Sequence, residues 1–334
     1  MAKASPINIE NELIDAKSRR GFGFAEGAYY EAISRLASLD RSLAKLKNNG
    51  DKELYRYFPV AAIAVLETHF KVIVATVIDS GPPYLERGLN LVRDKLMSAA
   101  DALPLLHRKN ISAGDIVSHS LPFNSIASLE RAYCALFDKD LKNVVQQIED
   151  PYVIRTGLES RGPIVPDVIT LWAGLARTFE RRHILAHESA EQFSISYEES
   201  REAVTCVTEF VKAIDAILWE TIWKDRPLTQ YEMNVSAGKE LRDARDVLAA
   251  RMRKALKIAT EDGQRARFRR MHFSRRAYFK QWIEWQDEQF TAGSIRPLLT
   301  ANGRTLALKC YIKELSNWIG QMRFEEPPEE DIDF

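Results

Sequence analysis

Residues Phe58 to Ile78 read FPVAAIAVLETHFKVIVATVI. This run is apolar on nearly all sides of a 3.6-residue helix, and Pro59 suits a first turn because the N–H that it lacks would have no partner there. We therefore expect a buried helix at the centre of the fold. Two polar side chains inside the run, Glu67 and His69, stand out against it.

The segments around this run share its helical period. Between Tyr30 and Lys47, apolar residues recur every three or four positions, and Asn48-Asn49-Gly50 predicts a stop. Further helices are expected near Leu85–Ala102, Asn124–Glu149, Pro166–Ala190 and Glu198–Trp223, with a loop from Glu149 to Pro166. Alternation suited to strands is scarce, so the sequence predicts an all-α fold.

Length and charge predict two domains. A chain of 334 residues exceeds the roughly 150 residues expected of one domain. The composition changes after Lys224-Asp225-Arg226-Pro227, and residues 239–280 carry fourteen Lys/Arg against five Asp/Glu. We expect a helical domain over residues 1–225, a smaller helical domain over 226–324 and an acidic disordered tail over 325–334.

Global composition excludes little. Lys plus Arg equals Asp plus Glu, at 47 each, so any argument for a nucleic-acid partner must be local. The first twenty residues lack an apolar signal-peptide core, and no uninterrupted apolar run approaches the roughly 20 residues of a membrane span. Three widely spaced cysteines fit a reducing compartment. We expect a cytoplasmic protein without a membrane partner.

The segment ERRHILAHES, residues 180–189, is the most informative for function. It places two arginines and two histidines within seven residues at the end of an apolar helix. Cleavage of RNA without a metal needs proton transfer at the 2′-hydroxyl and the 5′-oxygen, which imidazole supplies, and fixed positive charge at the phosphate, which guanidinium supplies. We therefore expect these residues to form a functional site rather than part of the hydrophobic core.

Arg182 and His187 lie about 140° apart around an ideal helix. The long Arg side chain, a bent helix end or a second subunit must therefore bring them together. A two-fold axis would place two copies of such a helix side by side, with the residues of both copies in one cleft. We therefore expect a homodimer.

RRHILAH resembles the signature of HEPN domains, in which an Arg is followed after four to six residues by a His. Arg182 and His187 match the four-residue spacing, and Arg181 matches the five-residue one. The helix around Glu67 resembles the early HEPN helix with its buried acid, and the Phe123-Asn124 segment follows in the same order. The likeness covers residues 27–223.

The resemblance implies a metal-independent endoribonuclease that leaves a 2′,3′-cyclic phosphate and acts as a toxin or in anti-phage defence, with an antitoxin or regulatory partner. Arg182 would bind the scissile phosphate, His187 would act in acid-base catalysis and His183 would assist. Arg181 would be a second phosphate ligand or a surface charge, and Glu67 would hold the Arg-His helix in place. No cofactor is implied.

Two alternatives stay open at these residues. A HEPN domain that has lost catalysis would use the same face only to dimerise and to bind a partner. His183 and His187 also have the four-residue spacing of a two-histidine metal site, although the acidic residues are not arranged as in HExxH.

The C-terminal domain is similar to the LprI family, known from secreted lysozyme inhibitors. The likeness rests on residues 228–237, 282–290 and 293–294 and covers about residues 228–322. Family members carry Cys at the positions of Ser236 and Phe290, and only Cys310 remains. The chain therefore lacks the bridging partners, which argues against lysozyme inhibition. Its basic helices are expected to bind RNA backbone, to form a solvated face or to sense a phage or cell-wall component.

Overall fold

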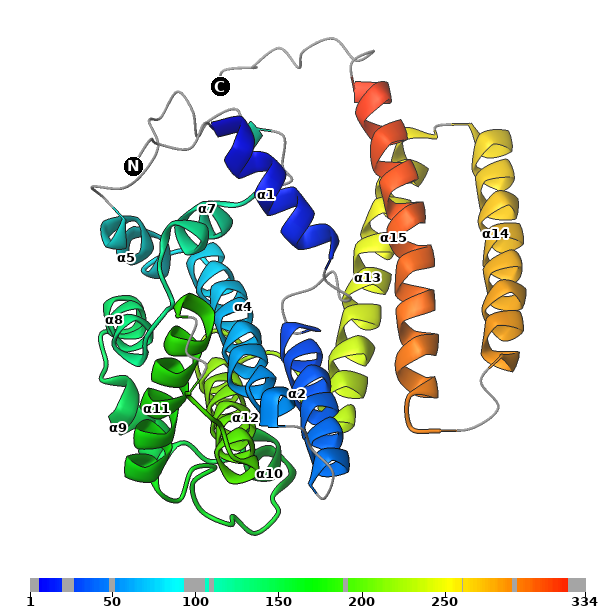
Figure 1. The fold of residues 1–334 in the computed structure, drawn as a ribbon. Coiled ribbons are helices and arrows are strands. Elements are labelled where there is room, and N and C mark those ends of the chain that lie inside the picture. The colour runs from blue at the N-terminus through cyan, green and yellow to red at the C-terminus, as the bar shows by residue number, and fades with distance from the viewer. Residues whose placement is uncertain are drawn as a thin grey trace. The chain divides into compact units, whose positions relative to one another are not determined.

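The computed structural model describes residues 6–19, 27–47, 52–92, 106–107, 111–188, 192–259, 261–289 and 293–323. All elements among these residues are helices, so the all-α prediction is confirmed for the described chain (Figure 1). Several predicted features, namely the stop at residues 48–50, the end of the 85–102 helix, position 290 and the acidic tail, lie outside the described residues.

The chain divides into two compact units, Met1–Arg226 and Pro227–Phe334, one residue beyond the predicted boundary. The described helices of the first unit are α1 Pro6–Ser18, α2 Gly27–Leu46, α3 Lys52–Tyr55, α4 Tyr57–Asp79, α5 Tyr84–Leu91, α7 Ala113–Ser120, α8 Ile126–Phe137, α9 Leu141–Gln147, α10 Pro151–Thr156, α11 Val168–His187 and α12 Tyr197–Glu220.

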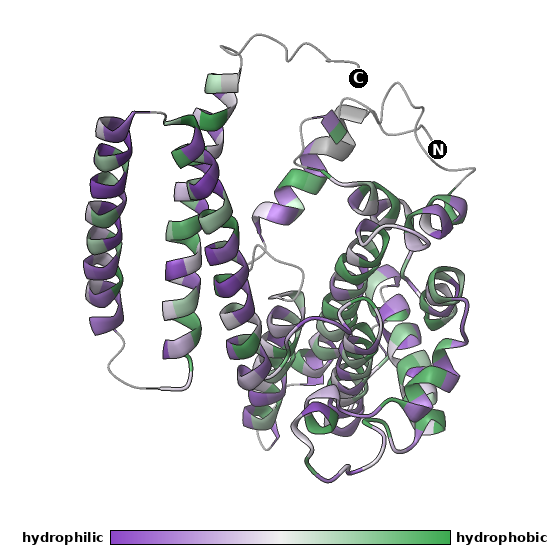
Figure 2. Ribbon diagram, turned by 180° about the vertical axis from the view of Figure 1, so that it is seen from behind, coloured by the Kyte–Doolittle hydropathy of each residue, from purple (hydrophilic) through white to green (hydrophobic). Residues whose placement is uncertain are grey.

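Helix α4 is the central element of the first unit, as its sequence predicts. It packs against α2, α7, α11 and α12, and Leu66, Phe70 and Val77 are buried among them. Figure 2 shows that the hydrophobic residues are concentrated on the central helices of this unit. Apolar burial of this kind is the main favourable contribution to folding.

Residues Lys52–Asp79 are also the one stretch of described helix whose length and hydropathy would allow it to cross a membrane. Glu67, His69 and Lys71 interrupt the apolar run, but the average hydropathy stays high across them. Of its most apolar window, 67% is buried inside the unit. The core of this unit therefore accounts for its hydrophobicity.

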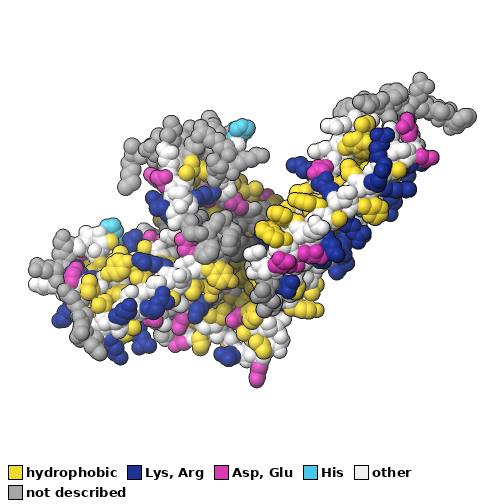
Figure 3. Space-filling model, turned by 90° about the vertical axis from the view of Figure 1, so that its right-hand side faces the viewer, with side chains coloured by type: hydrophobic (Ala, Val, Ile, Leu, Met, Phe, Trp, Pro, Cys, Tyr) yellow, Lys and Arg dark blue, Asp and Glu magenta, His cyan; other side chains and the backbone are white. Residues whose placement is uncertain are grey.

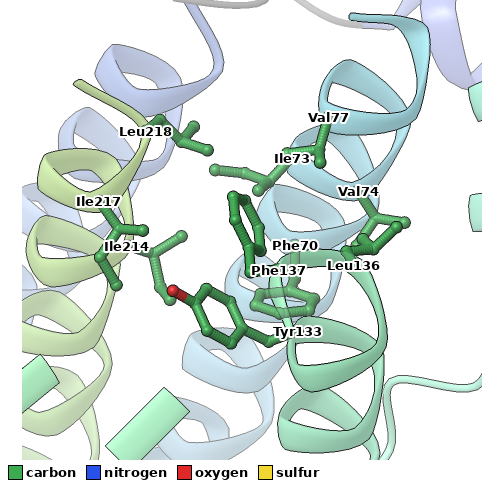
Figure 4. A pocket seen from close by; sticks show the side chains of 10 residues that line it. All are labelled: Phe70, Ile73, Val74, Val77, Tyr133, Leu136, Phe137, Ile214, Ile217 and Leu218. Atoms are coloured by element: carbon green, nitrogen blue, oxygen red, sulfur yellow. The ribbon is translucent and has the colours of Figure 1, made fainter. Parts of the chain in front are cut away.

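The side chains of α4, α8 and α12 point toward one another around a cavity of about 10 Å³ (Figure 4). Its walls are aromatic and aliphatic side chains, including Phe70, Tyr133 and Ile217. A space this small and apolar has no polar partners for a water molecule. The centre of the unit is close-packed and holds no ligand-sized chamber at this place.

Polar caps fix several helix starts. Ser125 and Ser196 each accept a hydrogen bond from the backbone N–H three residues later in a capping box. The prediction of a single helix over Asn124–Glu149 is wrong, because Asp138 adopts a left-handed conformation (φ 56°) and separates α8 from α9. The predicted loop over 149–166 contains the short helix α10, which Asp150 caps.

Helix α7 approaches α4 with backbone against backbone. A Cβ atom added at Gly114 would lie 2.2 Å from the carbonyl oxygen of Ala75, and the Gly114 N–H donates to Asp79 Oδ1 at 2.9 Å. Glycine is required here because any side chain would push the two helices apart.

Arg155 holds the backbone at the C-terminal end of the first unit. Its guanidinium donates hydrogen bonds to the carbonyl oxygens of Trp219 (3.2 Å), Lys224 (2.7 Å) and Arg226 (2.6 Å). It also lies over the Trp219 ring, 5.6 Å from the ring centroid. Carbonyl groups in the last turn of α12 and just after it are thereby satisfied from α10.

The second unit contains three long helices, α13 Gln230–Ile258, α14 Asp262–Glu288 and α15 Arg296–Arg323. Helices α13 and α15 pack together around a small core of Leu248, Ala255, Tyr311, Leu315 and Ile319. Helix α14, which the structure describes over its whole length, packs on α15 and has one buried residue, Ile283. Most of α14 is therefore accessible within this unit.

Candidate active site

The residues singled out in the sequence lie on two different faces of the last turns of α11. Leu171, Leu175 and Phe179 form the buried stripe of this helix, and Arg182 follows in the same row and is half-buried. His183 and His187 lie about 100° and 140° from Arg182 around the helix, and both are exposed. The helix thus directs the guanidinium toward its neighbours and both imidazoles toward solvent.

Arg182 pairs with Glu67 of α4. The Nη2 atom of Arg182 is 3.3 Å from Oε1 of Glu67, and the two side chains are 26% and 23% exposed. Burial raises the pKa of Glu67 above its ordinary value, and the positive charges of Arg182 and Lys71 offset part of that rise. Glu67 therefore holds Arg182 from the side of α4, while a quarter of the Arg side chain stays open to a ligand.

Arg181 has a different environment. Its Nη1 donates to Oε2 of Glu202 at 2.7 Å and its Nη2 donates to Oε1 of Glu199 at 2.8 Å, and the side chain is only 11% exposed. Arg177 also pairs with Glu202. Arg181 thus joins α11 to α12, and two carboxylates already balance its charge.

The same contacts act on the carboxyl groups. Burial raises the pKa of Glu202, but hydrogen bonds and charges from Arg177 and Arg181 outweigh it, so the pKa lies below its ordinary value. The pKa of Glu199 is lowered chiefly by the hydrogen bond from the Ser196 backbone. Both carboxylates are charged at neutral pH and keep Arg181 in place.

His183 and His187 lie side by side. Their ring centroids are 5.0 Å apart with the ring planes inclined by 54°, as expected for neighbours one helical turn apart. Both are exposed. Two imidazoles this close are able to serve two proton transfers on one substrate, one as base and the other as acid.

The structure brings Arg182, His183 and His187 to one helix end, but not into one contact. Among the described residues, no hydrogen bond or ion pair joins Arg182 to either imidazole. No group of three or more His, Cys, Asp or Glu side chains in the described ranges has the arrangement of a metal site. The two histidines thus lack a third protein ligand of these types there.

His69 is the other histidine that the sequence singled out. It is 3% exposed and lines a groove of about 510 Å³ between α2 and α4. Burial lowers its pKa to about 4. Neither ring nitrogen has a hydrogen-bond partner among the described residues. His69 is therefore neutral at physiological pH.

Sequence reasoning missed one titratable cluster. Burial raises the pKa of Asp215 to about 7, a hydrogen bond from Trp219 opposes the rise and the charge of Asp150 adds to it. Burial and the charge of Asp215 raise the pKa of Tyr29 to about 12. No local motif marks this cluster, because its members come from α2, α12 and the start of α10.

No protein-family model matches the chain, and neither a curated protein nor a solved structure matches it. The likenesses to HEPN domains and to the LprI family rest on the residues quoted in the sequence alone. The side chains at the end of α11 are therefore the physical basis for assigning a function.

Proposed function

We propose that this protein is a metal-independent endoribonuclease of the HEPN type. The observation that carries the proposal is the pair of exposed imidazoles, His183 and His187, with ring centroids 5.0 Å apart on the helix end that also bears the partly open guanidinium of Arg182. Acid, base and phosphate ligand are the three groups that metal-free RNA cleavage needs.

In the proposed reaction, one imidazole accepts the proton of the ribose 2′-hydroxyl while the 2′-oxygen attacks the adjacent phosphorus. The bond between phosphorus and the 5′-oxygen of the next nucleotide breaks, and the second imidazole donates a proton to that oxygen. The products are a 2′,3′-cyclic phosphate and a 5′-hydroxyl. Arg182 offers two N–H groups to the phosphate oxygens as negative charge gathers there.

We place the active form in a homodimer. In one chain, Arg182 turns toward α4 while the histidines face solvent, so a two-fold partner is the means of completing a cleft around one phosphate. A toxin or anti-phage role with an antitoxin or regulatory partner, in the cytoplasm, belongs to the same proposal and comes from the HEPN resemblance.

The ion pair between Arg182 and Glu67 supports a second candidate, a HEPN dimer without catalysis. An arginine whose charge is already matched by a carboxylate 3.3 Å away stabilises the contact of α11 with α4 without any ligand. In that case the exposed histidine face would bind a protein partner rather than RNA.

Incubation of the purified full chain with labelled RNA in excess EDTA separates the candidates. Cleavage that yields cyclic-phosphate ends and is lost in His187→Ala supports the ribonuclease. Absence of cleavage at every RNA and salt condition, in a chain that is folded and dimeric, supports the binding module. Cleavage that EDTA abolishes contradicts both and indicates a metal site.

A further inference from the structure

Helix α14 has one face that packs on α15. Phe268, His272, Phe279 and Ile283 lie along this face, and the His272 ring stacks on Tyr311 of α15 with centroids 5.8 Å apart. Their spacing of four, seven and four residues is that of an ordinary helix-helix contact. This face is fully explained by the fold of the second unit.

A second apolar row on α14 has no such explanation. Met271, Tyr278, Trp282 and Trp285 are 50%, 59%, 45% and 54% exposed, and at 100° per residue they fall within an arc of about 60°. The indole rings of Trp282 and Trp285 are 5.2 Å apart and inclined by 38°. Large aromatic side chains gathered on an exposed face are typical of a binding surface.

The same helix is strongly basic. From Gly263 to Ile283 it carries seven Lys/Arg and no Asp or Glu. Arg267 and Arg270 are exposed, lie on or beside the aromatic row and form no ion pair with any described residue. Figure 3 shows Lys and Arg side chains gathered along the helices of the C-terminal unit, with hydrophobic side chains among them.

We propose that this face of α14, formed by Arg267, Arg270, Met271, Tyr278, Trp282 and Trp285, binds single-stranded RNA. Unpaired bases stack on the tyrosine and tryptophan rings, and the arginines contact the phosphates. The row from Met271 to Trp285 is about 21 Å long at 1.5 Å per residue, which accommodates several nucleotides. The proposal rests on the ribonuclease function and names the substrate class as unpaired RNA.

The charge of the helix favours RNA over a second copy of this chain. Two copies of α14 packed through the row would bring together two helices that each carry seven Lys/Arg and no Asp or Glu from Gly263 to Ile283. Like charges brought this close repel. A polyanion removes the conflict because each phosphate neutralises one of the basic groups.

The test uses the full-length chain with Arg182→Ala and His187→Ala, so that RNA is bound but not consumed. Affinity for a labelled oligouridine is measured by fluorescence anisotropy over a series of salt concentrations. In this background, Tyr278→Ala and Trp285→Ala each weaken binding by about fivefold or more. Replacing both Arg267 and Arg270 by Ser lowers the slope of log affinity against log salt by about 1.4.

Matched controls lie on the same unit. Phe273 is 63% exposed on α14 but about 140° from Tyr278 around the helix, so Phe273→Ala is expected to change affinity by less than about twofold. Arg251 and Arg253 are exposed on α13, and their replacement by Ser leaves the salt slope unchanged. The side chains substituted on α13 and α14 are all exposed, and far-ultraviolet circular dichroism confirms that each variant is helical.

Three results overturn the proposal: unchanged affinity in the Tyr278 and Trp285 variants, equal losses in the Phe273 variant, or equally tight binding of duplex RNA. A fourth is a change from dimer to monomer in light scattering without a change in affinity, which assigns the row to a second copy. Binding that depends on the row in a wild-type chain that never cuts RNA supports the RNA face and overturns only the ribonuclease.

Discussion

Arg182 and Glu67 form an ion pair between α11 and α4, with Nη2 and Oε1 3.3 Å apart. The preceding residue, Arg181, faces α12 instead and is held by Glu199 and Glu202. The two adjacent arginines therefore have different environments. Arg181 is held by two carboxylates, whereas Arg182 is paired with one and remains partly accessible at the end of the helix.

Arg182→Ala is expected to lower the rate of RNA cleavage by about 100- to 1,000-fold, because the phosphate loses its charged donor. Arg182→Lys is expected to lose most of that rate as well, since an ammonium group does not bind two phosphate oxygens in the same plane. Initial rates on labelled RNA in EDTA measure both. A wild-type rate in Arg182→Ala contradicts the assignment.

Arg181→Ala is the matched comparison. It is expected to lower the free energy of unfolding by about 1–2 kcal/mol, because two partly buried carboxylates lose their partner. The folded fraction should cut RNA at nearly the wild-type rate. Urea unfolding and single-turnover cleavage measure the two effects. Loss of cleavage without loss of stability would make Arg181 a phosphate ligand.

His187→Ala is expected to reduce the cleavage rate by about 100- to 10,000-fold through loss of a proton-transfer group. His183→Ala should cause a smaller loss if it orients its neighbour and an equal loss if both imidazoles transfer protons. Cleavage rates from pH 5 to 9 distinguish these outcomes, since removing one of two transferring groups removes one limb of the profile. Full activity in His187→Ala would exclude it from the site.

Asp215→Asn is expected to stabilise the protein at alkaline pH. The pKa of Asp215 is about 7 in the folded chain against an ordinary value of 3.8. Between these values the folded state holds a proton that the unfolded chain has released, so the free energy of unfolding falls as the pH rises. The neutral amide avoids this loss, and the gain well above pH 7 is about 4 kcal/mol.

Urea unfolding of wild type and Asp215→Asn at pH 4, 6 and 8.5 tests this sign. The two curves should converge at the lowest pH, where the wild-type carboxyl is protonated in the folded state and about half protonated in the unfolded state. Lys212→Ala, an exposed change on the same helix, serves as the control. A constant difference between Asp215→Asn and wild type at all three pH values refutes the titration of Asp215.

Gly114→Ala is expected to destabilise the first unit by about 1–3 kcal/mol, because the added methyl group would lie against the Ala75 carbonyl oxygen and drive α7 from α4. Gly157→Ala is the comparison, because Gly157 has open space around it but a positive φ of 68°. This substitution is expected to lower the free energy of unfolding by about 1 kcal/mol through backbone strain and not through a steric clash. Equal thermal stability of Gly114→Ala and wild type would contradict the close approach.

The central helix was predictable because two local signals agree there. Pro59 marks the first turn, and the apolar side chains after it leave little polar surface, which favours a buried helix. The break after α8 was not predictable in this way, since apolar residues continue at a helical period through Phe137 and beyond. The break depends on the left-handed conformation of Asp138. Most Asp residues do not adopt this conformation, so the presence of an Asp does not predict it.

The sequence indicates where the candidate site lies, but it does not indicate which role each arginine has. Arg181 and Arg182 both satisfy the spacing to a histidine, and nothing local separates them. Their difference comes from distant carboxylates, with Glu199 and Glu202 on α12 and Glu67 on α4. The Asp215 cluster was missed for the same reason, because tertiary packing and not neighbouring sequence creates it.

Arg155 ends the first unit with three hydrogen bonds to carbonyl oxygens, the last of them at Arg226. The polypeptide is thereby anchored to its own unit just before the chain continues into α13. The direction in which the backbone leaves the first unit is therefore set by a single guanidinium. Without it, three carbonyl oxygens would depend on water for their hydrogen bonds.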